Sequence, residues 1–383
     1  MVAKSSVYKL CADFFDRYFH DEESIILLIM LAIGTLLILW LGSMLAPLFT
    51  AIVIAYLMQG LVNILLRFGA SATAAFIAVY LVFVGLFILS LVFLLPQAWN
   101  QLRRLVDDLP DLLTQWQGDL MLLPESYPNL ISESQVQDFI SGIRTGLGEY
   151  GQDLLQFWLF NIPNVIGWGV FIVLVPTLVF FVMKDKAELI EWTGNFLPRN
   201  RPLMIRIWHE MDVQISNYVR GKGLEILIVG LASFVLFSGV GLNYKVLLSV
   251  GVGLSVMVPY IGAAVITIPV AAVGYVQWGV GSEFYITIIG YGVLQLLDGN
   301  VLVPVIFSEA VNLHPVAILS AVLIFGGLWG LAGVFFAIPL ATLIKVIMNA
   351  WPSRLERWTL TEFGLLMLNL AEIKTGSLFY ILR

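Results

Sequence analysis

Long apolar stretches, separated by shorter polar ones, run along most of this chain. A helix needs about 20 mostly apolar residues to cross the hydrocarbon core of a bilayer. Eight stretches pass that test: 24–45, 46–66, 71–95, 157–183, 222–243, 246–276, 284–307 and 314–347. The pattern therefore predicts an all-α fold, a polytopic membrane helix bundle with about eight transmembrane helices.

Proline and glycine interrupt the last three stretches. Proline removes a backbone donor and clashes with the preceding turn, so we expect broken helices in the C-terminal half, and one of them is a candidate re-entrant segment. The candidates for helix breaks or gating are Pro259, Tyr260, Gly262, Gly299, Pro304 and Pro339. A run of small residues in the last stretch, Gly326, Gly327, Gly330 and Gly333, also permits close helix packing.

Two polar segments, 98–155 and 184–222, are too long to be plain loops. In the first, Leu102 and Leu105 begin a series of apolar residues at helical spacing, and in the second Met204 and Ile207 begin another. Such spacing is typical of amphipathic helices that lie against a bundle or a lipid surface. We therefore expect amphipathic extramembrane helices in both segments.

The distribution of basic residues predicts the topology. Of the 20 Lys and Arg residues, 16 fall in segments 1–23, 67–70, 184–222 and 345–383, and basic residues favour the cytoplasmic side. The predicted organisation is a cytoplasmic N-terminal segment 1–23, transmembrane helices 1–3 in 24–97, a periplasmic segment 98–155, transmembrane helices 4–8 in 156–352 and a cytoplasmic tail 353–383. Both termini are expected in the cytoplasm.

Composition agrees with a lipid environment and excludes several classes. Sixty per cent of the residues are apolar and 12% are charged, whereas soluble domains have about 25% charged residues. A net charge of −6 gives no electrostatic footprint for nucleic acid. One cysteine, Cys11, and three scattered histidines supply no metal-ligand spacing, and no phosphate-binding or protease motif occurs. We expect no cofactor, no metal and no enzymatic activity.

Ionisable residues within membrane segments are costly and suggest function. Asp298 lies between strongly apolar stretches, beside Gln295, Gly299 and Asn300. Asp-Gly-Asn favours a turn, so we expect a helix broken inside the membrane, whose freed backbone and side chains bind ions or polar substrates. The alternative is structural: Asp298 caps a half-helix and Asn300 satisfies the freed backbone.

Three further ionisable residues are candidates. Glu225 lies near the start of the fifth stretch and is either a binding residue or an interfacial partner of Arg220 or Lys222. Glu309 and His314 flank the last stretch, where they are candidates for a proton-linked role. For His314-Pro315 the simpler interpretation is the start of a helix.

Six strings in this order resemble the autoinducer-2 exporter family of bacterial inner-membrane proteins, and most closely its PerM-type permeases. They are 180–186, 218–222, 258–262, 297–304, 312–315 and 337–345. The resemblance covers about residues 20–352 and implies an eight-span bundle, a homo-oligomer, and export of the furanone signal autoinducer-2 or sodium(lithium)/proton antiport. This chain departs from the family pattern at Ala263, where many members have proline, and at Gly299, where many have asparagine.

Three functions follow as hypotheses. The first is a secondary transporter in the bacterial inner membrane that exports a small polar metabolite such as autoinducer-2. The second is a sodium(lithium)/proton antiporter in which Asp298 alternately binds a proton and Na⁺. The third is a non-transporting membrane scaffold that binds partners through residues 98–155. The expected partners are thus a small polar substrate or Na⁺ and H⁺, the lipid bilayer and further copies of the chain.

Overall fold

The computed structural model describes residues 22–121, 132, 134–138, 140–142, 165–199, 201–259, 261–307 and 313–350, and no strand occurs among them. Residues 1–21 of the predicted N-terminal segment 1–23, the predicted tail 353–383, and most of the second half of segment 98–155 lie outside the described residues. The chain divides into two compact units. Unit 1 takes its described residues from Met1–Ser43, Ile190–Gln214 and Pro339–Arg383, and unit 2 from Met44–Leu189 and Ile215–Ile338.

The prediction of a polytopic helical membrane protein is confirmed. Seven helical segments of the described chain are long and apolar enough to cross a membrane, and three shorter apolar helices accompany them. The seven are Ile25–Gly42, Met44–Arg67, Ala72–Asp108, Pro202–Val240, Ile261–Trp278, Ser282–Phe307 and Ala332–Ala350. The predicted fourth span, 157–183, is represented by the shorter helix Gly169–Lys184, because residues 157–164 lie outside the described part.

Several helices run through boundaries that the sequence suggested. Helix α2, Glu22–Arg67, contains the first two apolar stretches without interruption at Pro47. Helix α3, Ala72–Leu89, continues through the π-helical turn η1, Ser90–Leu94, into α4, Leu95–Met121. After α7, Val165–Lys184, and α8, Lys186–Gly194, the amphipathic start of α9, Pro202–Val240, joins the fifth apolar stretch. The amphipathic segments are thus continuous with membrane-length helices where they are described.

Unit 1 is held by side chains that satisfy the ends of its helices. The Glu23 carboxylate accepts a hydrogen bond from the Met204 backbone N–H at 2.8 Å, in the first turn of α9. Negative charge is favourable there because the first N–H groups of a helix have no partner within it. The Arg201 guanidinium donates to the carbonyl oxygens of Gly194 and Pro198, just before that turn.

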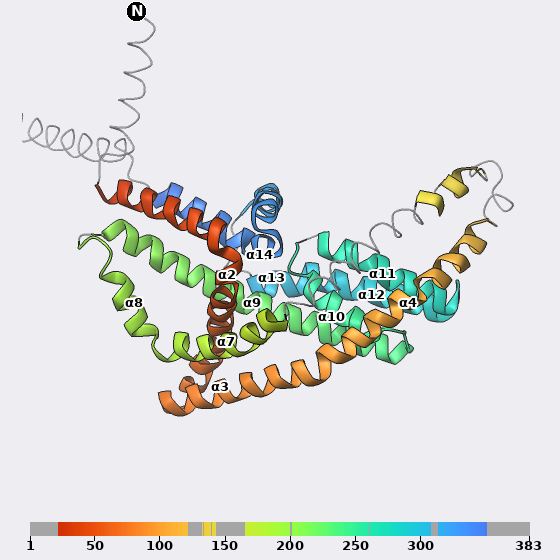
Figure 1. Ribbon diagram of the computed structural model, residues 1–383, viewed down its shortest axis with the longest axis horizontal. Coiled ribbons are helices and arrows are strands. Elements are labelled where there is room, and N and C mark those ends of the chain that lie inside the picture. The colour runs from red at the N-terminus through yellow and green to blue at the C-terminus, as the bar shows by residue number, and fades with distance from the viewer. Residues whose placement is uncertain are drawn as a thin grey trace, which may run out of the picture. The chain divides into compact units, whose positions relative to one another are not determined.

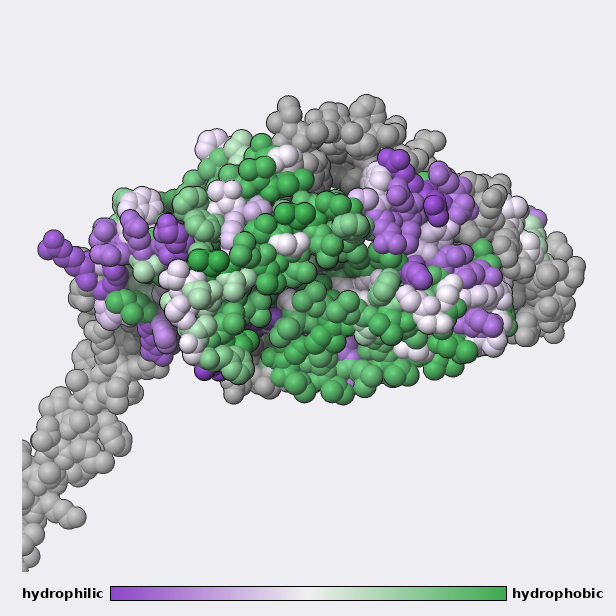
Figure 2. Space-filling view, turned by 90° about the horizontal axis from the view of Figure 1, so that it is seen from below, coloured by the Kyte–Doolittle hydropathy of each residue, from purple (hydrophilic) through white to green (hydrophobic). Residues whose placement is uncertain are grey.

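Unit 2 has apolar clusters inside and apolar side chains outside. One cluster joins α2, α3 and α7 around Ala75 and Val179. Another, around Phe237 and Val252, joins α9, the two helices that follow it and α12, Ser282–Leu297. Large apolar side chains are also exposed, including Leu231, which is 64% exposed. Hydrophobic residues cover much of the face seen in Figure 2. A surface of this kind suits contact with lipid rather than water.

The predicted sixth span, 246–276, is a helical hairpin instead of a single crossing. Helix α10, Lys245–Ser255, ends in a turn at Val256–Pro259, and α11, Ile261–Trp278, packs back along it (Figure 1). A methyl group on Gly262 would overlap the Ser255 carbonyl oxygen, so the two arms touch at this glycine. With 11 residues, α10 is about 16 Å long. This length is roughly half the thickness of the hydrocarbon core of a bilayer, which is about 30 Å. We call residues 245–278 the first hairpin.

Helix α4 and Gln277 hold the open end of the first hairpin. The Gln101 amide oxygen of α4 accepts from Leu247 N–H at 2.9 Å, in the first turn of α10. Gln277 of α11 accepts from Asn243 N–H and donates to Gly241 O. The two ends of the hairpin therefore lie together, beside α4, which runs along α10 and α11 in Figure 1.

Tyr244 begins α10 in an unusual backbone conformation, with φ of 54°. This left-handed region is strained for residues with a Cβ. The Tyr244 hydroxyl donates a hydrogen bond to the Asp108 carboxylate of α4. Burial, followed by this bond and the negative charge of Asp108, raises the pKa of Tyr244 from its usual 10.0 to about 12.

The predicted last span, 314–347, is also a hairpin. Helix α14, Pro315–Ala350, reverses at Gly330, where φ is 59° and ψ is −137°. A methyl group on Gly333 would overlap the Phe325 carbonyl oxygen, and one on Gly326 would lie 2.8 Å from Val334. The chain therefore turns back at Gly330, and the two arms touch close to this turn. We call residues 315–338 the second hairpin. The prediction of a break at Pro339 is wrong, because residue 339 is helical and buried.

Substitution of the glycines between the hairpin arms tests this packing. We expect Gly262→Ala and Gly333→Ala each to lower the free energy of unfolding by about 1–3 kcal/mol, because a new methyl group must displace backbone. The measurement is the thermal unfolding midpoint of the protein in detergent. Gly327→Ala is the control, since nothing lies within 4 Å of its methyl group. Equal midpoints for all three variants would contradict the hairpin packing.

Titration of Tyr244 tests the contact between α4 and the first hairpin. The pKa of Tyr244 is about 12 in the folded protein and 10.0 when unperturbed. Its contribution to stability is therefore full below pH 10.0 and is lost as the pH rises through about 12. The difference in tyrosinate absorbance between the wild type and Tyr244→Phe should show this late ionisation. Asp108→Asn should shift it to lower pH, and an unshifted curve would contradict the contact.

Candidate functional site

Asp298 begins a π-helical turn inside a continuous helix. Helix α12, Ser282–Leu297, leads into η3, Asp298–Leu302, and then into α13, Val303–Phe307. The predicted break at Asp298 is thus a widened turn, in which Val303 N–H donates to Asp298 O. Pro304 explains the widening, because it has no N–H to donate to the carbonyl four residues before it. Isolated π turns within helices are frequent at functional sites.

Asn300 and Gly299 lie on the exposed side of this turn. The Asn300 side-chain amide donates to Leu296 O at 2.9 Å, one turn earlier on its own helix. This bond keeps the Asn300 amide on its own helix, in agreement with the structural interpretation. A methyl group added to Gly299 would have nothing within 4 Å, so no close approach requires glycine there.

Glu225 forms a buried ion pair with Lys222. The Lys222 Nζ atom lies 2.7 Å from the Glu225 carboxylate, one turn along α9, and the side chains are 7% and 3% exposed. The prediction of a partner at helical spacing is correct for Lys222 and wrong for Arg220, which donates to Tyr56 O instead. Both side chains lie in the interior of unit 2.

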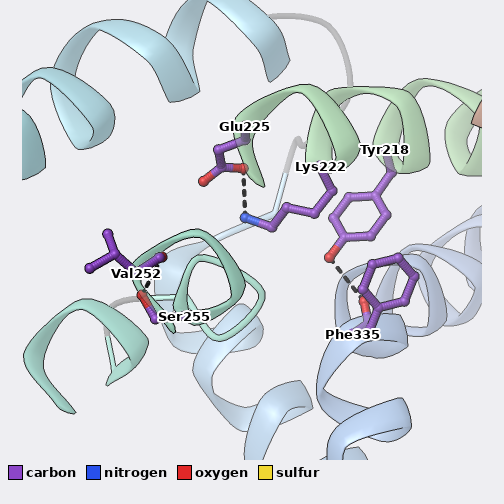
Figure 3. Close-up of polar contacts among 6 residues, drawn as sticks. All are labelled: Tyr218, Lys222, Glu225, Val252, Ser255 and Phe335. Atoms are coloured by element: carbon purple, nitrogen blue, oxygen red, sulfur yellow. Dashed lines mark hydrogen bonds and ion pairs between the residues drawn. The ribbon is translucent and has the colours of Figure 1, made fainter. Parts of the chain in front are cut away.

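The ion pair lies between the two hairpins. On one side, a methyl group on Gly253 of α10 would lie 2.9 Å from Ile226 O, so the first hairpin touches α9 next to Glu225. On the other side, the Tyr218 hydroxyl, one turn before Lys222, donates to Phe335 O of the second hairpin at 2.9 Å. Figure 3 shows the pair between the end of α10, with Ser255, and the arm that carries Phe335.

Asp298 adds a second carboxylate to this centre. It interacts electrostatically with both Lys222 and Glu225, and its Oδ1 atom is buried without a hydrogen-bond partner among the described residues. Lys222 also lies over the Phe307 ring, 5.6 Å from its centroid, which brings α13 to the same place. We call Lys222, Glu225 and Asp298 the charged centre.

Gln295 takes part in a contact between α12 and the first hairpin. Its Nε2 atom donates to the Tyr291 hydroxyl at 2.6 Å. That hydroxyl in turn donates to Ala263 O, just after the hairpin turn, at 3.4 Å. The side-chain amide is therefore part of a polar chain between α12 and α11.

The remaining predicted residues have separate positions. His314 is exposed, and its Nδ1 accepts from Val316 N–H at 3.2 Å, so it caps the start of α14 as the simpler interpretation proposed. Pro259 lies in the turn of the first hairpin, where its carbonyl accepts from Ile261 N–H. Tyr260 and Glu309 lie outside the described residues.

Sequence reasoning missed Lys222 as a site residue. It named Lys222 only as a candidate partner of Glu225. The available signal was spacing: Tyr218, Lys222 and Glu225 recur at intervals of four and three residues, so they share one face of α9. Trp329, beside the turn of the second hairpin, was also missed. Its indole nitrogen is buried without a hydrogen-bond partner among the described residues.

The charged centre has the chemistry to bind a small polar molecule or a monovalent cation. It contains two carboxylates and one ammonium group in an apolar surrounding, where an uncompensated charge is costly. No group of three or more metal-ligating side chains occurs in the described part of the chain. The unpaired Asp298 oxygen can accept a hydrogen bond or contact a cation.

Comparison with known proteins gives one consistent result. The family model of the AI-2E family transporters matches residues 26–353. The protein named "Putative permease PerM" of Escherichia coli (strain K12) is 44% identical over 344 residues, which are 90% of this chain and 98% of its own. "Putative transport protein YueF" of Bacillus subtilis (strain 168) is 25% identical over 315 residues, 80% of this chain and 84% of its own. "AI-2 transport protein TqsA" of Escherichia coli (strain K12) is 21% identical over 330 residues, 84% and 91% of the two chains.

Removal of one charge at a time tests the charged centre. We expect Lys222→Met to lower the free energy of unfolding by about 3–5 kcal/mol, because it leaves carboxylates buried without a cation. Glu225→Gln should cost less, since Lys222 then still faces Asp298. The double variant Lys222→Met/Glu225→Met should recover part of the loss. Unfolding midpoints in detergent provide the measurement, and additive losses in the double variant would contradict a coupled pair.

Proposed function

The chain belongs to the AI-2E transporter family, and on this premise we propose that it is a secondary transporter that exports a small polar metabolite such as autoinducer-2. The observation that carries the proposal is the charged centre, which lies beside α10 of the first hairpin and one turn from the contact of Tyr218 with the second. Transporter sites typically lie at mid-membrane, where interrupted helices bring backbone and side-chain polar groups together. Transport follows from membership of the family, whereas the identity of the cargo is our proposal.

The unpaired oxygen of Asp298 suits a cargo with hydroxyl groups. This oxygen is a buried acceptor without a hydrogen-bond partner among the described residues. A polyhydroxylated molecule can donate a hydrogen bond to it. The protein "AI-2 transport protein TqsA" is named for such a cargo, and its 21% identity supports a related chemistry. Because the sequence contains no ATP-binding motif, energy would come from an ion gradient.

One observation favours a second candidate, exchange of cations for protons. The charged centre holds two carboxylates but one lysine, so it carries one net negative charge when all three groups are ionised. A buried net charge is unfavourable, and a proton or Na⁺ at Asp298 neutralises it. Competition of the two cations for one carboxylate would be sufficient for antiport, and it would also couple cargo export to a cation gradient.

We also propose that the protein lies in the bacterial inner membrane with both termini in the cytoplasm. The bias of 16 of 20 basic residues towards the corresponding segments supports this orientation. The presence of two hairpins in place of two crossings does not change this orientation. A re-entrant hairpin leaves the chain on the side where it entered, so replacing two crossings by two hairpins keeps the number of crossings even. The first hairpin would open to the periplasm and the second to the cytoplasm.

Reconstituted protein tests both candidates in one experiment. Proteoliposomes with labelled autoinducer-2 and an internal pH dye are exposed to a proton or Na⁺ gradient. We expect gradient-dependent cargo movement, at least about tenfold slower in Asp298→Asn because a buried charged contact is lost. Glu283→Gln is the control, since Glu283 is an exposed carboxylate at the start of the same helix.

The outcomes separate the hypotheses. A dye response to Na⁺ without cargo movement would replace export by antiport. Cargo movement that Asp298→Asn leaves unchanged would remove the charged centre from the mechanism. Silence in both assays, with a stoichiometric partner bound through residues 98–155, would favour the scaffold.

A further inference from the structure

The two hairpins are built in the same way. In each, the second arm begins with a glycine whose added methyl group would overlap a carbonyl oxygen of the first arm: Gly262 against Ser255 and Gly333 against Phe325. Each second arm then continues into the string Ile-Pro-x-Ala, at 268–271 and at 338–341. A long helix precedes each hairpin, α9 before the first and α12 with α13 before the second.

A tyrosine hydroxyl binds the backbone of each hairpin just after its glycine. Tyr218 donates to Phe335 O, two residues after Gly333, at 2.9 Å. Tyr291 donates to Ala263 O, directly after Gly262, at 3.4 Å. Both tyrosines are buried, with 3% and 2% exposure. Phe335 O has no helical donor four residues on, because Pro339 lacks an N–H, so loss of the Tyr218 hydroxyl leaves it unsatisfied. Ala263 O also accepts from the Thr267 hydroxyl at 2.6 Å and keeps that donor when Tyr291 is released.

Each tyrosine binds the hairpin that does not directly follow its own helix. Tyr218 belongs to α9, which precedes the first hairpin, but it holds the second; Tyr291 belongs to α12, which precedes the second hairpin, but it holds the first. Tyr218 lies one turn from Lys222 on α9, and Gln295 and Tyr291 lie one and two turns before Asp298 on α12. Each hydroxyl thus connects a helix of the charged centre to a hairpin that faces the centre.

We propose that Tyr218 and Tyr291 are reciprocal latches, each of which keeps one hairpin closed over the charged centre. Release of Tyr218 opens the second hairpin and release of Tyr291 opens the first, so that access to the centre changes from one end of unit 2 to the other. The purpose of the latches rests on the proposed transport function, but their existence does not. Tyr218 forms the shorter bond and holds its hairpin more firmly.

Chemical labelling of buried thiols tests the latches without a transport measurement. In a Cys11→Ser background, Ile338→Cys places a thiol in the apolar cluster of Tyr218, and Val270→Cys places one in the cluster of Tyr291. The reaction rate of each thiol with a membrane-permeable maleimide reports opening of its hairpin. Replacement of tyrosine by phenylalanine keeps the ring and removes the hydroxyl.

Each variant should affect its own hairpin. We expect Tyr218→Phe to raise the rate at position 338 roughly fivefold, as expected for one hydrogen bond, and to leave position 270 unchanged. Tyr291→Phe should raise the rate at position 270, by a smaller factor, and leave position 338 unchanged. Tyr80→Phe is the matched control, because its hydroxyl donates to Pro176 O between α3 and α7, away from both hairpins. It should change neither rate.

Two results would overturn the proposal. One is an unchanged rate at position 338 in Tyr218→Phe; the other is an equal increase at both positions in each variant, which would indicate general loosening. If a cysteine variant fails to fold, hydrogen exchange of the native backbone at 331–338 and 261–270 gives the same comparison. Selective labelling in proteoliposomes that transport nothing would support the latches and count against the transport function alone.

Discussion

A buried ion pair has to be compensated by the groups around it, and the C-terminal half of unit 2 is organised by that requirement. Lys222 and Glu225 lie 2.7 Å apart in an apolar interior, where loss of either partner leaves a charge without solvent. Burying the pair costs more than its attraction returns unless neighbouring groups share the charge. The Phe307 ring contributes a contact to Lys222, whereas Asp298 adds a second carboxylate and leaves the centre with one net negative charge when all three groups are ionised. Stability alone does not explain such a centre, because apolar side chains would fill the same space more favourably.

The hairpins explain how a charged centre can exist at this depth. The first hairpin brings the last turns of α10 to α9, where Gly253 approaches Ile226 O, and the second brings Phe335 to Tyr218 of α9. Glycine at the contact between the arms permits the approach, as at Gly262 and Gly333. Outside the hairpins, α4 and its contacts at Gln101 and Asp108 hold the first hairpin at its open end. The open end of the first hairpin is thus held by α4 and Gln277, while its arms touch at Gly262 near the turn.

Much of this fold follows from hydrophobic patterning, but the hairpins do not. The apolar stretches 246–276 and 314–347 have the length and composition of ordinary spans, because a re-entrant hairpin and a crossing helix bury similar surfaces. Proline marked one reversal, since Pro259 lies in the turn of the first hairpin as predicted, whereas Pro47, Pro176, Pro269 and Pro339 all lie inside helices. The second hairpin reverses at Gly330 through a left-handed backbone, a feature that one glycine among several does not reveal. At the site, Asp298 was identifiable as a carboxylate in an apolar stretch, whereas Lys222 was recognisable only through its partner.

The central claim is that the charged centre between the hairpins is where the cargo binds. An experimental density map of the protein with saturating autoinducer-2, at a resolution that shows side chains, tests it most directly. The account predicts density for the cargo in contact with the Asp298 carboxylate, between the turns at 256–259 and at Gly330. Cargo density elsewhere, with Asp298 packed against dry side chains, would contradict it.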